Sequence, residues 1–196
     1  MSGNDGNFKS GISAHIARSR RRKTAPGKIA VWAWAAIRAV EYVYSLDSTH
    51  KDAIILAGHG ILARSAMLAT GYNDDVGYVI ANGLDSRPMP YDNDDKISAI
   101  SFYDNPHLYC PAFAEMPFGN ECSALLSLCI GKSILMASAE DGASNNLVNK
   151  IIPTAKELKA SDIYYHTRPG SDYLSREDWN IYLDIIDSKI GRKTSI

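Results

Sequence analysis

The sequence predicts an α/β fold in which a mostly parallel sheet of about four strands is flanked by helices. The first observation is that short apolar runs alternate along the chain with segments of helical periodicity, a pattern typical of repeated strand–helix units. The second is the glycine-rich turn Gly58-His59-Gly60, which separates the first apolar run from the helix after it. A length of 196 residues suits one domain with a sizeable core.

The chain divides into a basic flexible tail, residues 1–26, and one folded domain, residues 27–196. The tail is rich in Gly, Ser and Asn, and it carries a tight cationic cluster: Arg18, Arg20, Arg21, Arg22 and Lys23. A solvated arm is the simpler interpretation, and the alternative is an arm that makes weak contacts with phosphate groups of a polyanion. The cluster has no interleaved aromatic residue, so it is weak evidence for nucleic-acid binding.

The first half of the domain predicts two helices and two strands. Apolar residues recur at three- and four-residue steps from residue 29 to about residue 45, which predicts a helix. Residues 53–57 predict a short buried strand, residues 61–70 a helix of small residues, and residues 76–81 a second strand. The following segment, residues 82–96, is rich in aspartate but lacks the glycine and closing glutamate of an EF-hand, so a solvated loop is favoured over a metal loop.

The second half continues the alternation. The expected elements are a short apolar helix, a third strand, a partly helical segment and a fourth strand, at residues 124–130, 133–138, 147–158 and 163–165. The last helix begins at Ser175, where Asp178 three residues later suggests a capping box. Trp179, Tyr182 and Leu183 belong to the apolar stripe of this helix.

Composition excludes several classes of protein. The formal net charge is -1, which gives no global field toward nucleic acid or a membrane surface. The sequence has no run of 18 or more apolar residues, so no transmembrane helix is expected. The first residues lack the charged-then-apolar pattern of a signal peptide, and the sequence leaves the location of the protein open.

No metal or cofactor site is expected from the cysteines and histidines. The odd count of cysteines without a Cys-x-x-Cys pair favours reduced, mostly buried thiols. His59, His107 and His166 have no short ligand spacing. We interpret all five histidines of the chain as ordinary hydrogen-bonded residues.

Five separated motifs identify a family resemblance. They are Ile29–Trp34 followed by Arg38 and Tyr42, Gly58–Arg64, Pro106–Cys110, Ala137–Glu140, and the set His166, Arg168, Gly170, Asp178 and Trp179. In this order they resemble the bacterial glucuronoyl esterase and acetyl xylan esterase-like proteins of carbohydrate esterase family 15 and its relatives. The resemblance implies the C-terminal part of an α/β-hydrolase fold without its N-terminal half. It also implies an ancestry in ester hydrolysis on plant cell-wall polysaccharides.

The catalytic positions of that family are substituted. The resemblance places Gly60 at the nucleophilic serine, Ile61 at an arginine that helps to hold the oxyanion, and Asp172 at the histidine base. Asp141 is the one candidate left for the acid of the triad, and Leu108 replaces a substrate-facing tryptophan. Ester hydrolysis needs a nucleophile, a base and oxyanion donors together, so a catalytically inactive protein is expected.

Two other functions remain open at this point. One is an interaction module on a half-hydrolase scaffold, and the other is a weak carboxylic ester hydrolase with a different nucleophile. In the half-fold the first strand, residues 53–57, lies at an edge of the sheet, and an open apolar edge invites pairing. The tail, a second copy in a homodimer or a partner chain could cover it.

Overall fold

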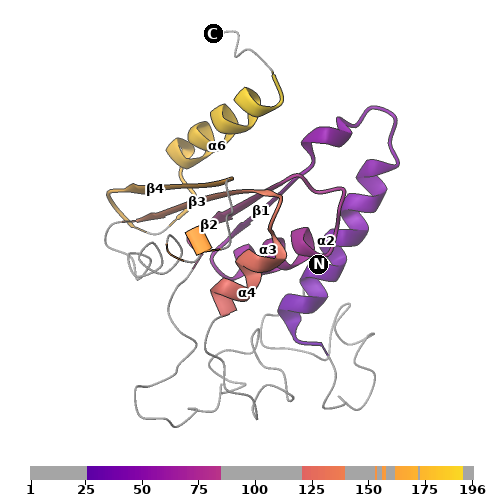
Figure 1. The fold of residues 1–196 in the computed structure, drawn as a ribbon, viewed down its shortest axis with the longest axis horizontal. Coiled ribbons are helices and arrows are strands. Elements are labelled where there is room, and N and C mark those ends of the chain that lie inside the picture. The colour runs from indigo at the N-terminus through magenta and orange to yellow at the C-terminus, as the bar shows by residue number, and fades with distance from the viewer. Residues whose placement is uncertain are drawn as a thin grey trace.

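The computed structural model describes residues 26–84, 121–139, 162–171 and 173–191, and singly residues 153, 156 and 157. The elements in chain order are helix α2 (Lys28–Tyr44), the 3₁₀ turn η1 (Lys51–Ala53), strand β1 (Ile55–His59), helix α3 (Ile61–Gly71), strand β2 (Tyr78–Asn82), helix α4 (Glu121–Leu128), strand β3 (Ser133–Ala139), strand β4 (Ile163–Arg168) and helix α6 (Arg176–Lys189). Figure 1 shows their arrangement.

The described residues form a parallel α/β sheet, as predicted. The sheet has four strands in the order β1-β2-β3-β4, and each neighbouring pair is parallel. The carboxyl ends of all four strands therefore lie at the same end of the sheet. The turn after β1 and the loop after β4 are at this end (Figure 1). The α/β-hydrolase type of fold expected from the motifs is consistent with this topology.

Some element ends differ from the prediction. Strand β4 continues to Arg168, three residues past the predicted end, so His166 lies in the strand and not in the following loop. Strand β2 begins at Tyr78, and α4 spans Glu121–Leu128. The expected loop 82–96 and the helical segment 147–158 lie mostly outside the described residues.

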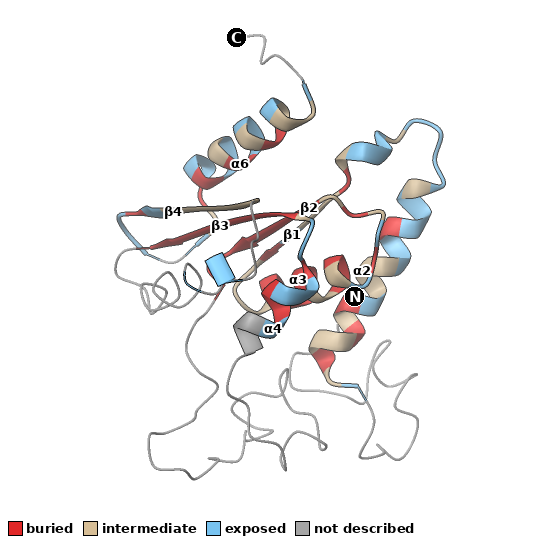
Figure 2. Cartoon of the chain, viewed as in Figure 1, coloured by how far each residue is buried: buried red, intermediate tan, exposed pale blue. Residues whose placement is uncertain are grey.

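Helices cover both faces of the sheet. In Figure 1, α3 and α4 lie below the strands and α6 lies above them. Alternate side chains of β2 and β3 point to opposite faces, which builds one core on each side. The core under α3 and α4 includes Met67, Val79, Leu126, Ile134 and Met136, and the core under α6 includes Tyr78, Ile80, Leu135, Tyr182 and Ile186. Strands β2 and β3 are buried over their whole length, whereas β1 and β4 are not (Figure 2).

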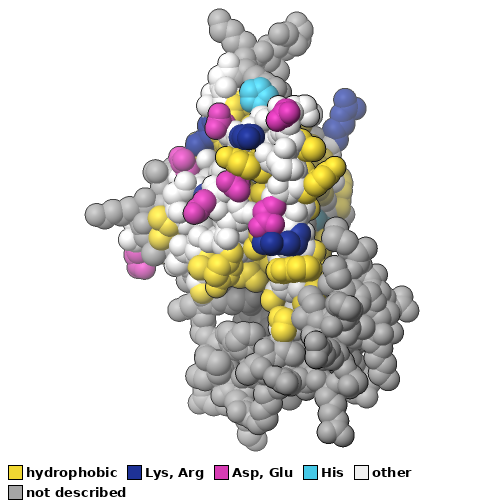
Figure 3. Space-filling view, turned by 90° about the vertical axis from the view of Figure 1, so that its right-hand side faces the viewer, with side chains coloured by type: hydrophobic (Ala, Val, Ile, Leu, Met, Phe, Trp, Pro, Cys, Tyr) yellow, Lys and Arg dark blue, Asp and Glu magenta, His cyan; other side chains and the backbone are white. Residues whose placement is uncertain are grey.

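Helix α2 packs on the outer side of α3. The Ser65 hydroxyl of α3 donates to the Ile29 carbonyl of α2 at 3.3 Å, and Val40 packs against Ile54 and Val76. Figure 3 shows the side of the molecule on which α2 lies, where cationic, acidic and hydrophobic side chains are interspersed. The described part of this face therefore has no large patch of one sign. Of the helices that the structure describes, none has both the length and the apolar character to cross a bilayer.

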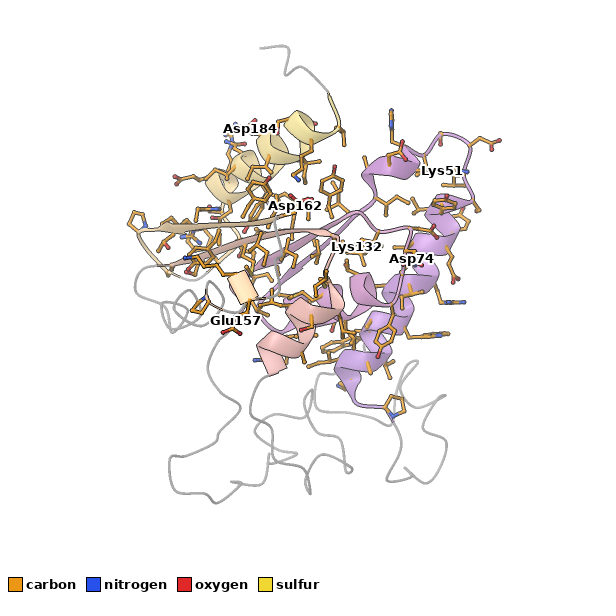
Figure 4. The ribbon with its side chains drawn as sticks, viewed as in Figure 1. Lys51, Asp74, Lys132, Glu157, Asp162 and Asp184 are labelled. Carbon is orange, nitrogen blue, oxygen red and sulfur yellow. The ribbon has the colours of Figure 1, made fainter. Side chains whose placement is uncertain are left out.

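The start of β3 is fastened to the loop after α3. The Lys132 ammonium donates to the carbonyl oxygens of Asn73 and Asp74 at 3.3 and 3.0 Å (Figure 4). Nearby, the buried Cys129 thiol is a free cysteine that donates to the Met67 carbonyl, and burial raises its pKa to about 11. This agrees with the prediction of a reduced, buried thiol at this position; Cys110 and the side chain of Cys122 lie outside the described residues.

Candidate functional site: the elbow after β1

The turn between β1 and α3 is formed by Gly60. This residue follows His59, the last residue of β1, and it is the N-cap of α3. Its backbone has φ 57° and ψ -122°, a conformation that residues other than glycine rarely adopt. Its amide donates to the Asn82 carbonyl at 3.0 Å, which ties the turn to the end of β2. The predicted strand–turn–helix at Gly60 is therefore present.

Gly58 lets the helix approach the strand. A Cβ built on Gly58 would lie 2.3 Å from the Leu62 carbonyl oxygen and 2.5 Å from its carbon. Backbone atoms are never this close to a real Cβ, so the first turn of α3 rests directly on β1 only because residue 58 has no side chain.

The elbow has room for a side chain but carries no nucleophile. A Cβ built on Gly60 meets no atom within 4 Å, so space does not forbid a serine there. Ile61, which starts α3, has no polar hydrogen to donate from its side chain. Ser65, one turn further on, is buried and bonded to Ile29. Between Gly58 and Arg64 the chain has neither a hydroxyl nor a thiol group.

A series of polar side chains begins next to the elbow and continues along the α6 face of the sheet. The His59 Nδ1 donates to the Asn82 Oδ1 at 2.8 Å, and the Asn82 Nδ2 donates to the Tyr182 hydroxyl at 3.0 Å. The Tyr182 ring lies 5.6 Å from the His166 ring, measured between centroids. These contacts join the ends of β1, β2 and β4 to α6.

This series of polar contacts ends at the buried ion pair of Arg168 and Asp178. The Asp178 carboxylate is fully buried and accepts from the Arg168 Nε at 3.0 and 3.1 Å, from the His166 Nε2 at 2.8 Å, and from the Ser175 amide at 2.8 Å. In return, the Ser175 hydroxyl accepts from the Asp178 amide at 3.0 Å, which completes the predicted capping box. Asp178 therefore caps α6 and neutralises Arg168 at the same time.

The protonation of this network follows from its contacts. Burial alone raises the pKa of Asp178, but the hydrogen bonds from Ser175, His166 and Arg168 outweigh it and lower the pKa to about 2. Burial also raises the pKa of the Tyr182 hydroxyl well above its usual value. The carboxylate stays charged and the phenol neutral across the physiological range, so neither group is poised to exchange a proton near neutral pH.

The loop after β4 is held by Arg168. Its guanidinium donates from Nη1 to the Ser171 carbonyl at 3.0 Å and from Nη2 to the Tyr173 carbonyl, and it lies 4.3 Å from the centroid of the Tyr173 ring. This loop and Gly60 both lie at the end of the sheet where the carboxyl ends of the strands meet. Asp172, Asp141 and Leu108, the other positions singled out by the resemblance, lie outside the described residues.

Sequence reasoning missed the partnership of Asn82 with Tyr182. It assigned residue 82 to a polar loop and residue 182 to an apolar stripe, whereas the side chains meet across 100 positions. The available signal was an amide that directly follows a buried strand. The interpretation of His59 and His166 as hydrogen-bonded residues agrees with the structure. In the described part of the chain, no group of three or more metal-binding side chains occurs.

The known proteins that are similar to this chain include carbohydrate esterases. Among curated proteins, carbohydrate esterase MZ0003 of an unknown prokaryotic organism is 25% identical over 93% of this chain and 50% of its own length. Glucuronoyl esterases from Teredinibacter turnerae and Solibacter usitatus superpose with TM-scores of 0.73 and 0.70, at 14% and 20% identity, over 93% and 88% of this chain. No family model matches the sequence.

The chain resembles the carbohydrate esterases in sequence and has their α/β-hydrolase fold. This carbohydrate-esterase-like chain spans about half the length of the relatives that it matches: 50% of the curated relative and 51–52% of the two structural neighbours. The family resemblance drawn from the five motifs is confirmed.

Proposed function

We propose that this chain is a catalytically inactive carbohydrate-esterase-like protein, in which the hydrolase fold serves as a scaffold. The observation that carries the proposal is Gly60, because a strand–turn–helix elbow of this type presents its nucleophile from the central residue of the turn and glycine has none.

The polar groups near the elbow support the same conclusion. The His166 Nε2 is engaged by Asp178, and both oxygens of that carboxylate are occupied by Arg168 and Ser175 as well. A general base must reach the proton that it removes, and Gly60 has no side-chain proton to offer. The bonds of these groups instead hold β4 to α6. They act as structural contacts around a turn that has nothing to activate.

Two serine hydroxyl groups near the elbow have structural partners. Ser138 near the end of β3 is buried and bonded to the Tyr165 hydroxyl. Ser175 caps α6. A weak carboxylic ester hydrolase, the alternative, would need a nucleophile from elsewhere in the chain and a base in reach of it.

The first testable prediction is that the full chain hydrolyses neither aryl acetates nor glucuronate esters above the buffer rate. Loss of one member of a catalytic triad typically lowers kcat by about 10⁴-fold or more, and here the nucleophile itself is absent. The assay compares the chain with the Teredinibacter turnerae glucuronoyl esterase at equal concentration. Turnover by the purified chain that resists a serine-directed fluorophosphonate and is lost in Asp141→Ala would instead favour the weak hydrolase.

A further inference from the structure

We propose that the edge of β1, which no described strand covers, is an interaction surface for a second polypeptide that carries the complementary half of a carbohydrate-esterase-like fold and pairs an apolar strand with β1. This inference concerns binding and holds whether or not any hydrolysis is detected.

The backbone of β1 has one side unused by the described sheet. Bonding along a parallel strand alternates in direction. The Gly60 amide and the Ile54 carbonyl both bond to the β2 segment, so the even-numbered residues between them face β2. Ile55, Ala57 and His59 therefore turn their amide and carbonyl groups the other way, where the described residues supply no neighbouring strand.

The sequence of β1 is that of an internal strand. It reads Ile-Leu-Ala-Gly-His and has no lysine, acidic residue or proline, the devices by which natural proteins blunt an edge. Continuous apolar runs are typical of parallel strands in the interior of a sheet whose two faces are covered by helices. Ala57, in the middle of the strand, is nevertheless exposed.

The opposite edge differs. Strand β4 reads Ile-Tyr-Tyr-His-Thr-Arg. At its start the Asp162 carboxylate bonds to the Lys189 ammonium of α6 at 3.2 Å, and the same ammonium lies 5.2 Å from the centroid of the Tyr164 ring. Figure 4 labels Asp162. Polar and charged groups along β4 hinder pairing with another strand. The two edge strands of the described sheet therefore differ, and β1 lacks such groups.

The flank of α6 that leans toward β1 is apolar and exposed. Around the helix, at about 100° per residue, Tyr182 lies between Asp178 and Trp179, with Leu183 beyond them. Asp178 reaches β4 and Tyr182 reaches β2, so the next flank faces β1. There Trp179 is 36% and Leu183 46% exposed. A partner seated on β1 would bury both side chains.

The relatives indicate the kind of occupant. Each superposed esterase matches nearly all of this chain with only about half of its own length. In those proteins the matched half shares a molecule with another part of similar size. A partner with that complementary half supplies an apolar strand for β1 and an apolar surface for Trp179 and Leu183.

The second prediction tests this surface by co-expression of the full tagged chain with either of two probes. The probes are the halves of carbohydrate esterase MZ0003 and of the Teredinibacter turnerae esterase that have no counterpart in this chain. The wild-type chain is expected to retain at least one half in equal proportion. Ala57→Pro removes an outward amide without breaking a β1–β2 bond, and is expected to weaken retention by about tenfold or more.

Thr167→Pro is the matched control. The Ile134 amide bonds to the Asp162 carbonyl, so by the same alternation Thr167 on β4 directs its amide outward, and Thr167 is exposed like Ala57. This variant is expected to retain the probe as the wild type does, and circular dichroism melts establish that both variants fold. If Ala57→Pro fails to fold, Ala57→Lys replaces it.

Three results would overturn the proposal. The wild-type chain could retain neither half, or Ala57→Pro and Thr167→Pro could behave alike. Alternatively, sedimentation could show a homodimer that Ala57→Pro dissociates, which would make a second copy the occupant. Protection of the Ile55, Ala57 and His59 amides from hydrogen exchange only in the presence of the probe is the supporting result.

Discussion

Replacing Asp178 with alanine is expected to lower the free energy of unfolding by about 3–5 kcal/mol at pH 7. Asp178 is fully buried and Arg168 is only 4% exposed, so removal of the carboxylate leaves a guanidinium buried without its counter-charge. The Ser175 amide at the start of α6 loses its acceptor as well. Urea unfolding followed by circular dichroism measures the change.

Asp184→Ala is the matched control for this substitution. Asp184 is on the same helix but exposed (Figure 4), and its removal is expected to change the free energy of unfolding by no more than about 0.5 kcal/mol. Similar losses for both variants would contradict the assignment of Asp178 as the central contact of the network.

The same carboxylate makes stability depend on pH in the acid range. Its pKa is about 2 in the folded protein, below the value of about 3.9 expected for an unfolded chain. The stabilisation is therefore complete above about pH 5 and is lost as the pH falls toward 2, by about 2 kcal/mol in total. We therefore predict that this loss between pH 5 and pH 2 is absent from the unfolding curves of Asp178→Asn.

The second large effect on stability is expected for Gly58→Ala. The new Cβ would lie 2.3 Å from the Leu62 carbonyl oxygen, and the obstacle is backbone that cannot rotate away. Helix α3 must then move off β1 and off the core around Met67. We expect the free energy of unfolding to fall by about 3 kcal/mol or more, measured by chemical unfolding as above.

Gly60→Ala separates this steric clash from backbone strain. A Cβ at residue 60 meets no atom within 4 Å, but φ stays at 57°. The cost is then that of the conformation alone, about 1–3 kcal/mol. A Gly60→Ala variant less stable than Gly58→Ala would show that the close approach of helix and strand does not govern this turn.

Local patterns were enough to predict most of the fold. Residues 53–57 and 61–70 carry the period of a strand and of a helix, and the cap at Ser175 and Asp178 depends on residues three positions apart. Such features are set by the chain near them. Strand β4 was predicted too short because His166, Thr167 and Arg168 are polar, and their place in the sheet depends on pairing with β3.

The contacts of the site depend on register and could not be predicted in this way. His59, Asn82 and Tyr182 come together because β1 and β2 pair in one register and α6 crosses that face. No spacing in the sequence encodes this meeting. The glycine turn at Gly60, by contrast, could be predicted from the local sequence, because it depends on the residues next to it and not on the register of the sheet.

The double engagement of Asp178 has a consequence for how the protein opens locally. One carboxylate both starts α6 and holds the end of β4, so neither element can fray without breaking the bonds of the other. Segments coupled in this way exchange their amide hydrogens as one cooperative unit. The last helix and the fourth strand should therefore share a single opening free energy, although they are joined by a surface loop.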